Sequence, residues 1–200
     1  MPQNGAGPNK HLTYPDRGTL DRLIYKLPLL LWRLGYGPLL SHPSRGGSRM
    51  LALTTRGRKS GQARHTMVSQ IELDGRDYIL SGWGLRSQWV QNILQDPLVT
   101  VQVYRRTYSA RIRRVTDREE FARVAERIFQ TGGDSHFKPW LASQGINPTA
   151  EDLTAKRDQV FLFGFDPAQQ PGPRPLRSDL AWIHLILLGM ISGMIWLLVS

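Results

Sequence analysis

The stretch that decides the fold is residues 51–69, LALTTRGRKSGQARHTMVS. It begins as an apolar run with β propensity, breaks at a turn that contains Gly57 and Gly61, and becomes β-like again over residues 66–68. Glycine lets the backbone approach a ligand, and successive amides in such a turn can form an anion-binding nest. Cationic side chains surround the turn: Arg56, Arg58, Lys59 and Arg64. We therefore predict a binding loop for a phosphate or carboxylate ligand, with a solvated basic turn between two strands as the alternative.

The composition narrows the class of partner and of chemistry. The chain has 200 residues, a formal net charge of +10 and no cysteine. This length suits one globular domain with appendages, and the charge indicates an anionic partner, which could be a cofactor, a lipid or a nucleic acid. Without cysteine there is no disulfide, thiolate nucleophile or cysteine-ligated metal, and the five histidines form no metal-binding spacing. We therefore expect no metal site.

The C-terminal residues 180–199, LAWIHLILLGMISGMIWLLV, carry no formal charge. About 20 apolar residues suffice for a helix to span a bilayer, and a proline-rich linker with two arginines precedes them at 167–179. We predict a single-pass membrane anchor, with membrane lipid as a partner and the domain on the cytoplasmic side by the positive-inside rule. A buried core helix is the alternative. Gly189 and Gly193 have the spacing of paired membrane helices, which leaves room for a homodimer.

The N-terminal part divides into a tail and a helical segment. Residues 1–18 are rich in Pro, Gly and Asn and show no periodicity, so we expect a disordered tail. Residues 19–47 form a helical segment, because leucine and isoleucine recur at helical spacing, and Pro28 is expected to divide it into two short helices. This segment either lies on a membrane surface as a basic amphipathic helix or packs on the domain that follows.

Residues 48–166 hold a β-rich domain. After the opening strand and loop, Asp74-Gly75 separates two β-like runs at 67–73 and 76–80, which is a strong hairpin signal. Three more strands are expected at residues 98–104, 107–115 and 159–165. Hairpin connections imply about six antiparallel strands, and closing such a sheet into a small barrel removes its exposed edges.

Helices are expected at the margins of this sheet. Ser87 could cap a short helix over residues 88–93, and a capping box at 116–119 opens a helix that ends near Gln130. Two further short helices are expected at residues 135–143 and 149–157. The predicted fold class is therefore mainly β with flanking helices (α+β), followed by the C-terminal membrane helix.

Three segments carry a resemblance to a known family: LTTRGRKSGQAR at 53–64, DGRDYILSGWG at 74–84 and WVQNILQDPLVTVQV at 89–103. In this order and spacing they resemble the deazaflavin-dependent nitroreductase and quinone reductase family, whose cofactor is the 8-hydroxy-5-deazaflavin coenzyme F-420. The resemblance runs over residues 20–166. It implies a split β-barrel of the kind shared with flavin-mononucleotide (FMN) oxidoreductases.

The resemblance also implies a cofactor site. The cationic loop would bind the phosphate and anionic tail, residues 64–69 would line the deazaflavin ring largely through backbone, and residues 81–84 and 89–92 would cover and complete the pocket. The residues expected to bind the cofactor are Arg58, Lys59, Ser60, Arg64, His65, Thr66, Met67, Val68, Ser69, Ser81, Gly82, Trp83, Gly84, Trp89 and Asn92.

The chain departs from the nitroimidazole-activating relatives at two places. Its 81–89 loop is shorter, and Trp83 stands where those relatives have a lysine, with Arg86 as the nearest replacement. Phe137 and Trp140 lie in the region that holds their substrate-pocket tyrosines. These departures concern the acceptor side of the pocket more than the cofactor side.

By this resemblance the reaction is hydride transfer from reduced deazaflavin to an electron-poor acceptor such as a quinone or a nitro compound. No catalytic residue is assigned, and His65 and Ser69 are candidate hydrogen-bond donors to the ring or to the acceptor. A membrane anchor favours a lipid-soluble acceptor. The alternatives are an FMN-dependent oxidoreductase on the same barrel and a non-enzymatic cofactor- or lipid-binding protein at the membrane. Nucleic acid is not expected, because the aromatic side chains do not interleave with the basic run.

Overall fold

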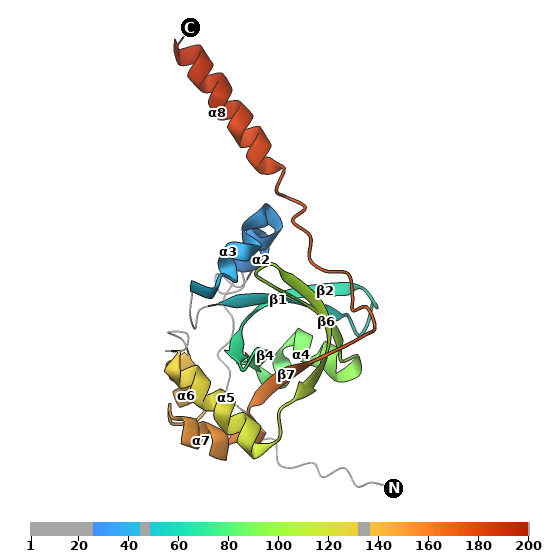
Figure 1. Cartoon of the computed structure of the whole chain (residues 1–200), viewed down its shortest axis with the longest axis vertical. Helices are drawn as coiled ribbons and strands as arrows, with labels where there is room; N and C mark the ends of the chain where they lie inside the picture. The colour runs from blue at the N-terminus through green and yellow to red at the C-terminus, as the bar shows by residue number, and fades with distance from the viewer. Residues whose placement is uncertain (1–25, 45–48, 132–136, 200) are drawn as a thin grey trace.

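A single curled sheet of seven antiparallel strands forms the body of the protein, seen here in a computed structural model that describes residues 26–44, 49–131 and 137–199 (Figure 1). The strands are β1 (Met50–Arg56), β2 (Ala63–Ser69), β3 (Ile71–Leu73), β4 (Arg76–Ser81), β5 (Leu98–Val103), β6 (Arg106–Arg114) and β7 (Phe161–Pro167). Their order in the sheet is β2-β1-β5-β6-β7-β4-β3. The mainly β, antiparallel half-barrel with flanking helices confirms the coarse fold prediction, although six strands were expected.

The additional strand arises because the predicted strand 67–73 is divided at Gln70. This residue is buried, and its backbone N–H donates to the Arg49 carbonyl oxygen at 2.9 Å while its side-chain amide donates to Asp77 Oδ1 at 2.6 Å. The chain changes partner at this point, so β2 pairs with β1 and β3 pairs with β4. The short strand β3 is therefore a consequence of one buried polar residue.

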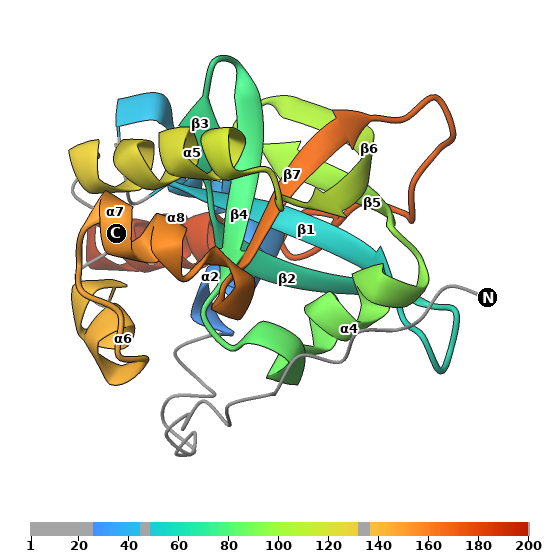
Figure 2. The same cartoon turned by 90° about the horizontal axis from the view of Figure 1, so that it is seen from below.

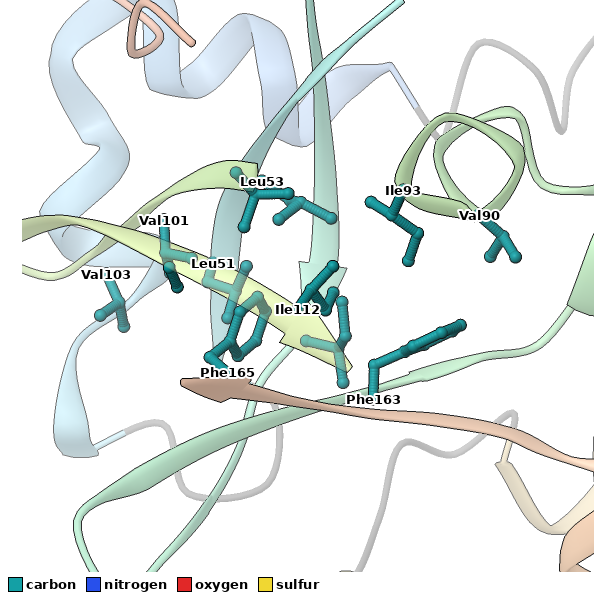
Figure 3. Packing of buried hydrophobic residues seen from close by; sticks show 12 residues of the cluster. Leu51, Leu53, Val90, Ile93, Val101, Val103, Ile112, Phe163 and Phe165 are labelled. Carbon is teal, nitrogen blue, oxygen red and sulfur yellow. The ribbon is translucent and has the colours of Figure 1, made fainter. Parts of the chain in front are cut away.

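An apolar core fills the inside of the sheet (Figure 3). Leu51 and Leu53 of β1 contribute side chains that are fully buried, and Val101 of β5 and Phe163 of β7 meet them from other strands. Helix α4 (Gln88–Gln95) closes one opening of the barrel with Val90 and other apolar residues. This alternation of inward apolar residues is what the strand periodicity predicts.

The other helices lie around the sheet (Figure 2). They are α5 (Arg118–Gln130), α6 (Phe137–Ser143) and α7 (Ala150–Ala155), with short turns η3 (Gly84–Arg86) and η4 (Arg157–Gln159). The predicted capping box is one residue out of place, because the Asp117 carboxylate, and not Thr116, caps α5 by accepting from the Glu120 N–H at 2.8 Å. Ser87 precedes α4 but does not cap it, since its hydroxyl pairs with that of Ser81 at 3.1 Å.

The N-terminal helical segment packs on the outside of β1. It consists of α2 (Leu27–Leu31), the π-helical turn η1 (Trp32–Tyr36) and α3 (Gly37–Leu40). The predicted division at Pro28 is wrong, because this proline lies in the first turn of α2, where no amide is needed, and the kink falls at Gly35 with φ of 98°. Trp32 is buried against Ala52 and Leu176. The predicted N-terminal tail lies outside the described residues.

Residues 168–179, which we call the strap, are attached to the sheet along their length. The Thr100 hydroxyl donates to the Pro173 carbonyl oxygen at 2.5 Å, and the Gln102 side-chain amide accepts from and donates to the backbone of Leu176 at 2.7 and 3.1 Å. Figure 1 shows the strap running beside β6 toward the end of the barrel that carries the N-terminal helices. The predicted linker is thus a packed segment that joins the two ends of the chain.

The C-terminal helix α8 (Ile183–Val199) projects away from the barrel (Figure 1). It begins three residues later than the predicted helix over 180–199, because the Leu180 N–H donates to the Arg33 carbonyl oxygen at 3.0 Å and residues 180–182 form a turn. Within the part of the chain that the structure describes, no helix has both the length and the apolar content required to cross a membrane. The predicted transmembrane anchor is therefore not confirmed.

A charged cluster attaches α5 to the sheet. Arg113 of β6 donates two hydrogen bonds to Glu120 of α5, at 2.7 and 2.9 Å, and the Tyr78 hydroxyl donates a third at 3.0 Å. The Arg113 guanidinium is the main reason that the pKa of Glu120 lies below its ordinary value. The ionised carboxylate is therefore the form that stabilises this contact.

We predict that Gly172→Ala destabilises the fold. An added Cβ at Gly172 would lie 2.4 Å from Thr100 Oγ1 and 2.5 Å from the Val99 carbonyl oxygen, so the strap has to shift away from β5. We expect a loss of about 1–3 kcal/mol in the free energy of unfolding, measured with urea. Gly189→Ala is the control, because nothing lies within 4 Å of its added Cβ. Equal stability of the two variants would contradict the packing of the strap.

We predict that Glu120→Gln lowers the free energy of unfolding at pH 7 by about 1.5–3 kcal/mol, because hydrogen bonds to an ionised group are lost. A carboxylate whose folded-state pKa is lowered stabilises above its ordinary pKa, here 4.5, and the contribution is lost as the pH falls through the folded-state pKa. The wild-type advantage should therefore shrink below about pH 4.5. Urea unfolding of both proteins across pH measures it, and a constant difference would contradict this account.

Candidate cofactor site

A cavity of about 1010 Å³ lies beside β2. This strand is at the end of the sheet order and pairs with β1 along one edge. Successive residues of β2, from Arg64 to Ser69, all line the cavity, although neighbours on a strand point to opposite faces. The cavity therefore follows the open edge of β2, where backbone N–H and C=O groups are available to a ligand.

The structure brings the predicted site residues together around this one cavity. All of them line it except Gly84: Arg58, Lys59, Ser60, Arg64, His65, Thr66, Met67, Val68, Ser69, Ser81, Gly82, Trp83, Trp89 and Asn92. Gly84 is buried behind the cavity wall with φ of 47°, and its carbonyl oxygen accepts from the Ser87 N–H at 3.2 Å. It shapes the loop without reaching the cavity. The binding roles of the lining residues stay predictions.

The cationic loop differs from the predicted backbone nest. The amides of Gly57, Ser60 and Gly61 donate to carbonyl oxygens inside the loop at 2.7 to 3.2 Å, and that of Gln62 reaches Ser60 Oγ at 3.4 Å. The Arg58 amide donates to Asn92 Oδ1 at 3.2 Å. Because most loop amides are already bonded, an anion at this loop would be held mainly by cationic side chains, and the expectation of a backbone nest is not met.

Arg58 is fixed in place by α4. Its Nη1 donates to Gln88 Oε1 at 2.9 Å and lies 3.5 Å from Asn92 Oδ1. Asn92 is buried, and its Nδ2 donates to Thr55 Oγ1 at 3.0 Å, so it joins β1, the loop and α4. A guanidinium held in this way loses less freedom when it binds an anion. Asn92 thus holds the cationic loop in position in addition to lining the cavity.

Lys59 and Arg64 supply more mobile charge. Both side chains are exposed, and Arg64 Nη2 contacts Ser60 Oγ only at 3.4 Å. Lys59 Nζ has no hydrogen bond or ion pair to the described residues. Cations of this kind can turn toward a phosphate or carboxylate without breaking an internal contact.

His65 lies half-buried on β2, opposite Thr54 of β1. Its Nδ1 is 2.9 Å from Thr54 Oγ1. Burial of the ring, with the positive charge of Arg33 as the second cause, lowers the pKa of His65. The imidazole is therefore neutral at pH 7, and it can offer a hydrogen bond to a neutral acceptor.

Trp140 holds the loop after β4 without lining the cavity. Its Nε1 donates to the Gly82 carbonyl oxygen at 2.7 Å, and its ring stacks on Phe137 with centroids 5.9 Å apart. Trp83, next in the chain, reaches the cavity. The two aromatic residues of α6 therefore support the covering loop, which the sequence did not predict.

The cavity also has a wall that the sequence did not predict. The additional lining residues are Lys26, Pro28, Leu29, Met50, Gly57, Leu80, Arg86, Ser87 and Gln88. The first three belong to the N-terminal helical segment, and their approach depends on how Trp32 packs against the sheet. Gly57 and Arg86 lie within or beside predicted segments and could have been found there.

The curled antiparallel sheet, with a cationic loop beside the edge strand β2, agrees with the split β-barrel that the sequence resemblance implies. Residues 40–134 match the model of the family described as "F420H(2)-dependent quinone reductase". This match confirms the family that the three sequence motifs indicate. The matched segment, 95 of the 200 residues, is thus similar to F-420-dependent reductases, a family whose description names reduced F-420 as the reductant.

Several solved structures are similar in part. The conserved hypothetical protein Rv2991 of Mycobacterium tuberculosis is 18% identical over 63% of this chain and 76% of its own, with a TM-score of 0.41. A protein described as an F420-H2 dependent reductase is 20% identical over 58% of this chain and 93% of its own, with a TM-score of 0.38. No curated protein matches the chain. At these TM-scores the similarity adds no support for the fold, and the fold assignment depends on the observed sheet topology alone.

The residues at the cavity fit the deazaflavin cofactor. F-420 carries a phosphodiester and glutamyl carboxylates, and Arg58, Lys59 and Arg64 supply cations at one end of the cavity. The apolar side chains of Val68 and Trp89 and the open edge of β2 suit a flat ring with polar edges. Among the described residues, no group of three or more His, Asp and Glu side chains could hold a metal ion.

We predict that Lys59→Ala weakens binding of oxidised F-420 about tenfold, because one charge-assisted hydrogen bond is worth about 1.5–3 kcal/mol when buried and less at this exposed position. Quenching of the cofactor fluorescence during titration measures the dissociation constant. Arg111→Ala is the matched control, since this exposed cation lies on β6 and does not line the cavity. An equal effect of the two variants would mean that only net charge matters.

Proposed function

We propose that the protein transfers a hydride from reduced coenzyme F-420 to a quinone-type acceptor at a membrane surface. The observation that carries this proposal is the cavity along the open edge of β2, with cations at one end and apolar residues at the other. When bound, the cofactor supplies the hydride, and a proton from water completes reduction of a quinone to a hydroquinone.

The protein's own residues bind the cofactor, orient the reacting groups and exclude water from the cavity. Arg58, set by Gln88 and Asn92, provides a fixed cation for the anionic tail. The β2 edge provides backbone donors and acceptors in a fixed row, which orients a ring against it. The loop held by Trp140 covers the cavity. Such positioning can supply much of the rate enhancement of a hydride transfer, because the reacting atoms are held together.

The acceptor lies, in this proposal, on the side of β2 that faces the N-terminal helices. Pro28, Leu29 and Met50 give that side of the cavity an apolar wall, which suits a lipophilic ring better than a charged substrate. The neutral His65 imidazole is the candidate hydrogen-bond donor to the acceptor oxygen. Ser69 is the second candidate, at the far end of the same strand.

We further propose that α8 seats the protein in a membrane with the barrel on the cytoplasmic side. Seven large apolar side chains of α8 are half or more exposed, including Leu185 at 72% and Met190 at 67%. An apolar helix that projects from the barrel without covering it favours lipid as its surroundings. A homodimer through this helix stays a prediction.

An FMN-dependent reaction on the same barrel is the second candidate function. The edge of β2 would receive an isoalloxazine ring as well as a deazaflavin ring, and the cationic loop would accept its single phosphate. The several cations around the loop, Arg58, Lys59 and Arg64, favour the longer polyanionic tail. A binding protein without turnover is the third candidate.

The test is a rate measurement with the full chain in detergent or lipid. We expect oxidation of reduced F-420 in the presence of menadione, and a higher kcat/KM for quinones with an isoprenoid chain than for water-soluble nitro compounds. His65→Ala should lower kcat at least about tenfold with little change in cofactor affinity, because one hydrogen bond to developing charge is lost. Tight F-420 binding without oxidation by any of these acceptors would contradict the proposed reaction.

A further inference from the structure

We infer that the outer face of the N-terminal helices is a docking surface for an anionic lipid bilayer, and that the cavity opens beside it. The inference rests on the proposed membrane location. The face consists of three exposed leucines, whereas Trp32 of the same segment is buried and Leu29 packs partly buried beside it. Their exposed fractions are 51% for Leu27, 44% for Leu30 and 60% for Leu39.

This face lies at the end of the barrel from which α8 projects (Figure 1). The base of α8 is tied to the same helices by a set of contacts that we call the clamp. Arg33 donates two hydrogen bonds to Asp179, at 2.6 and 2.8 Å, and Tyr36 Oη lies 2.8 Å from His184 Nε2. The leucine face and the apolar helix are therefore held together as one surface.

The charges around this surface suit anionic headgroups. Residues 26–44 contain Lys26 and Arg33 and no carboxylate. The strap adds Arg174 and Arg177, both exposed, and its one carboxylate, Asp179, is paired with Arg33. Cations beside an apolar helix face are the arrangement by which peripheral segments bind anionic membranes.

Charge also favours lipid over a second copy of this chain as the occupant. Two copies joined through this face would bring the cations of both surfaces together, since a twofold contact presents the same patch on each side. No acidic patch in residues 26–44 could offset them. An anionic bilayer meets the leucines and the cations at once.

The consequence for function lies in the position of the cavity. Lys26, Pro28 and Leu29 line the cavity, and Leu27 and Leu30 of the leucine face are their neighbours in the chain. A lipophilic acceptor in the bilayer would thus reach β2 past the side of α2, without crossing water. By tying α8 to the N-terminal helices, the clamp would keep the opening of the cavity at the lipid surface.

The absence of cysteine from the sequence makes a direct test simple. Full-length Leu39→Cys, Leu187→Cys and Glu126→Cys proteins would each carry one environment-sensitive fluorophore. They would be reconstituted with vesicles of phosphatidylcholine alone or with phosphatidylglycerol, containing a lipid-borne quencher near the headgroups. Position 39 tests the leucine face, position 187 tests α8, and position 126 on α5 is the matched exposed control.

We expect quenching at position 39 that is at least twofold stronger with phosphatidylglycerol than without it, and none at position 126. Quenching at 187 without quenching at 39 would overturn the inference and leave α8 as the membrane contact. Quenching at neither position would overturn the membrane location itself. A shift of emission at 39 without vesicles, dependent on protein concentration, would identify a second copy as the occupant and would also overturn the inference.

Discussion

The rest of the site depends on one constraint, that among the described residues β2 pairs with a neighbouring strand along one edge only. An open strand edge exposes a row of donors and acceptors, which proteins usually shield. Here the cavity runs along it, with the cationic loop at one end and the N-terminal helices beside it. A flat cofactor with a polar edge would complete the pairing that the sheet leaves open.

Buried polar residues set the shape around this edge. Gln70 ends β2 by joining Asp77 and the backbone of Arg49, and Asn92 joins the loop to β1 and α4. Unpaired polar groups in such positions would be costly, so each bond fixes a direction of the chain. Hydrogen bonds also hold the strap against the sheet and, through the clamp, the base of α8 against the N-terminal helices.

Local patterns were enough to predict much of this fold. Asp74 and Gly75 form the expected turn with positive φ, and the apolar alternation placed most strands. All the residues that the motifs predicted for the site line the cavity apart from Gly84, although the cavity has further lining residues. What sequence could not give depends on long-range contacts: the break at Gln70, the wall from Lys26, Pro28 and Leu29, and the packing of the strap. The loop amides were misjudged because most of them donate to acceptors within the loop itself, while that of Arg58 donates to Asn92, which lies far away in the sequence.

The central claim is that this barrel binds a deazaflavin along β2 in preference to a flavin. The most direct measurement is a titration of the full chain with oxidised F-420 and with FMN, at low and at high salt. The account predicts tighter binding of F-420, with an affinity that falls more steeply with salt because its tail carries more negative charge. Tighter binding of FMN, or F-420 binding that is independent of salt, would contradict it.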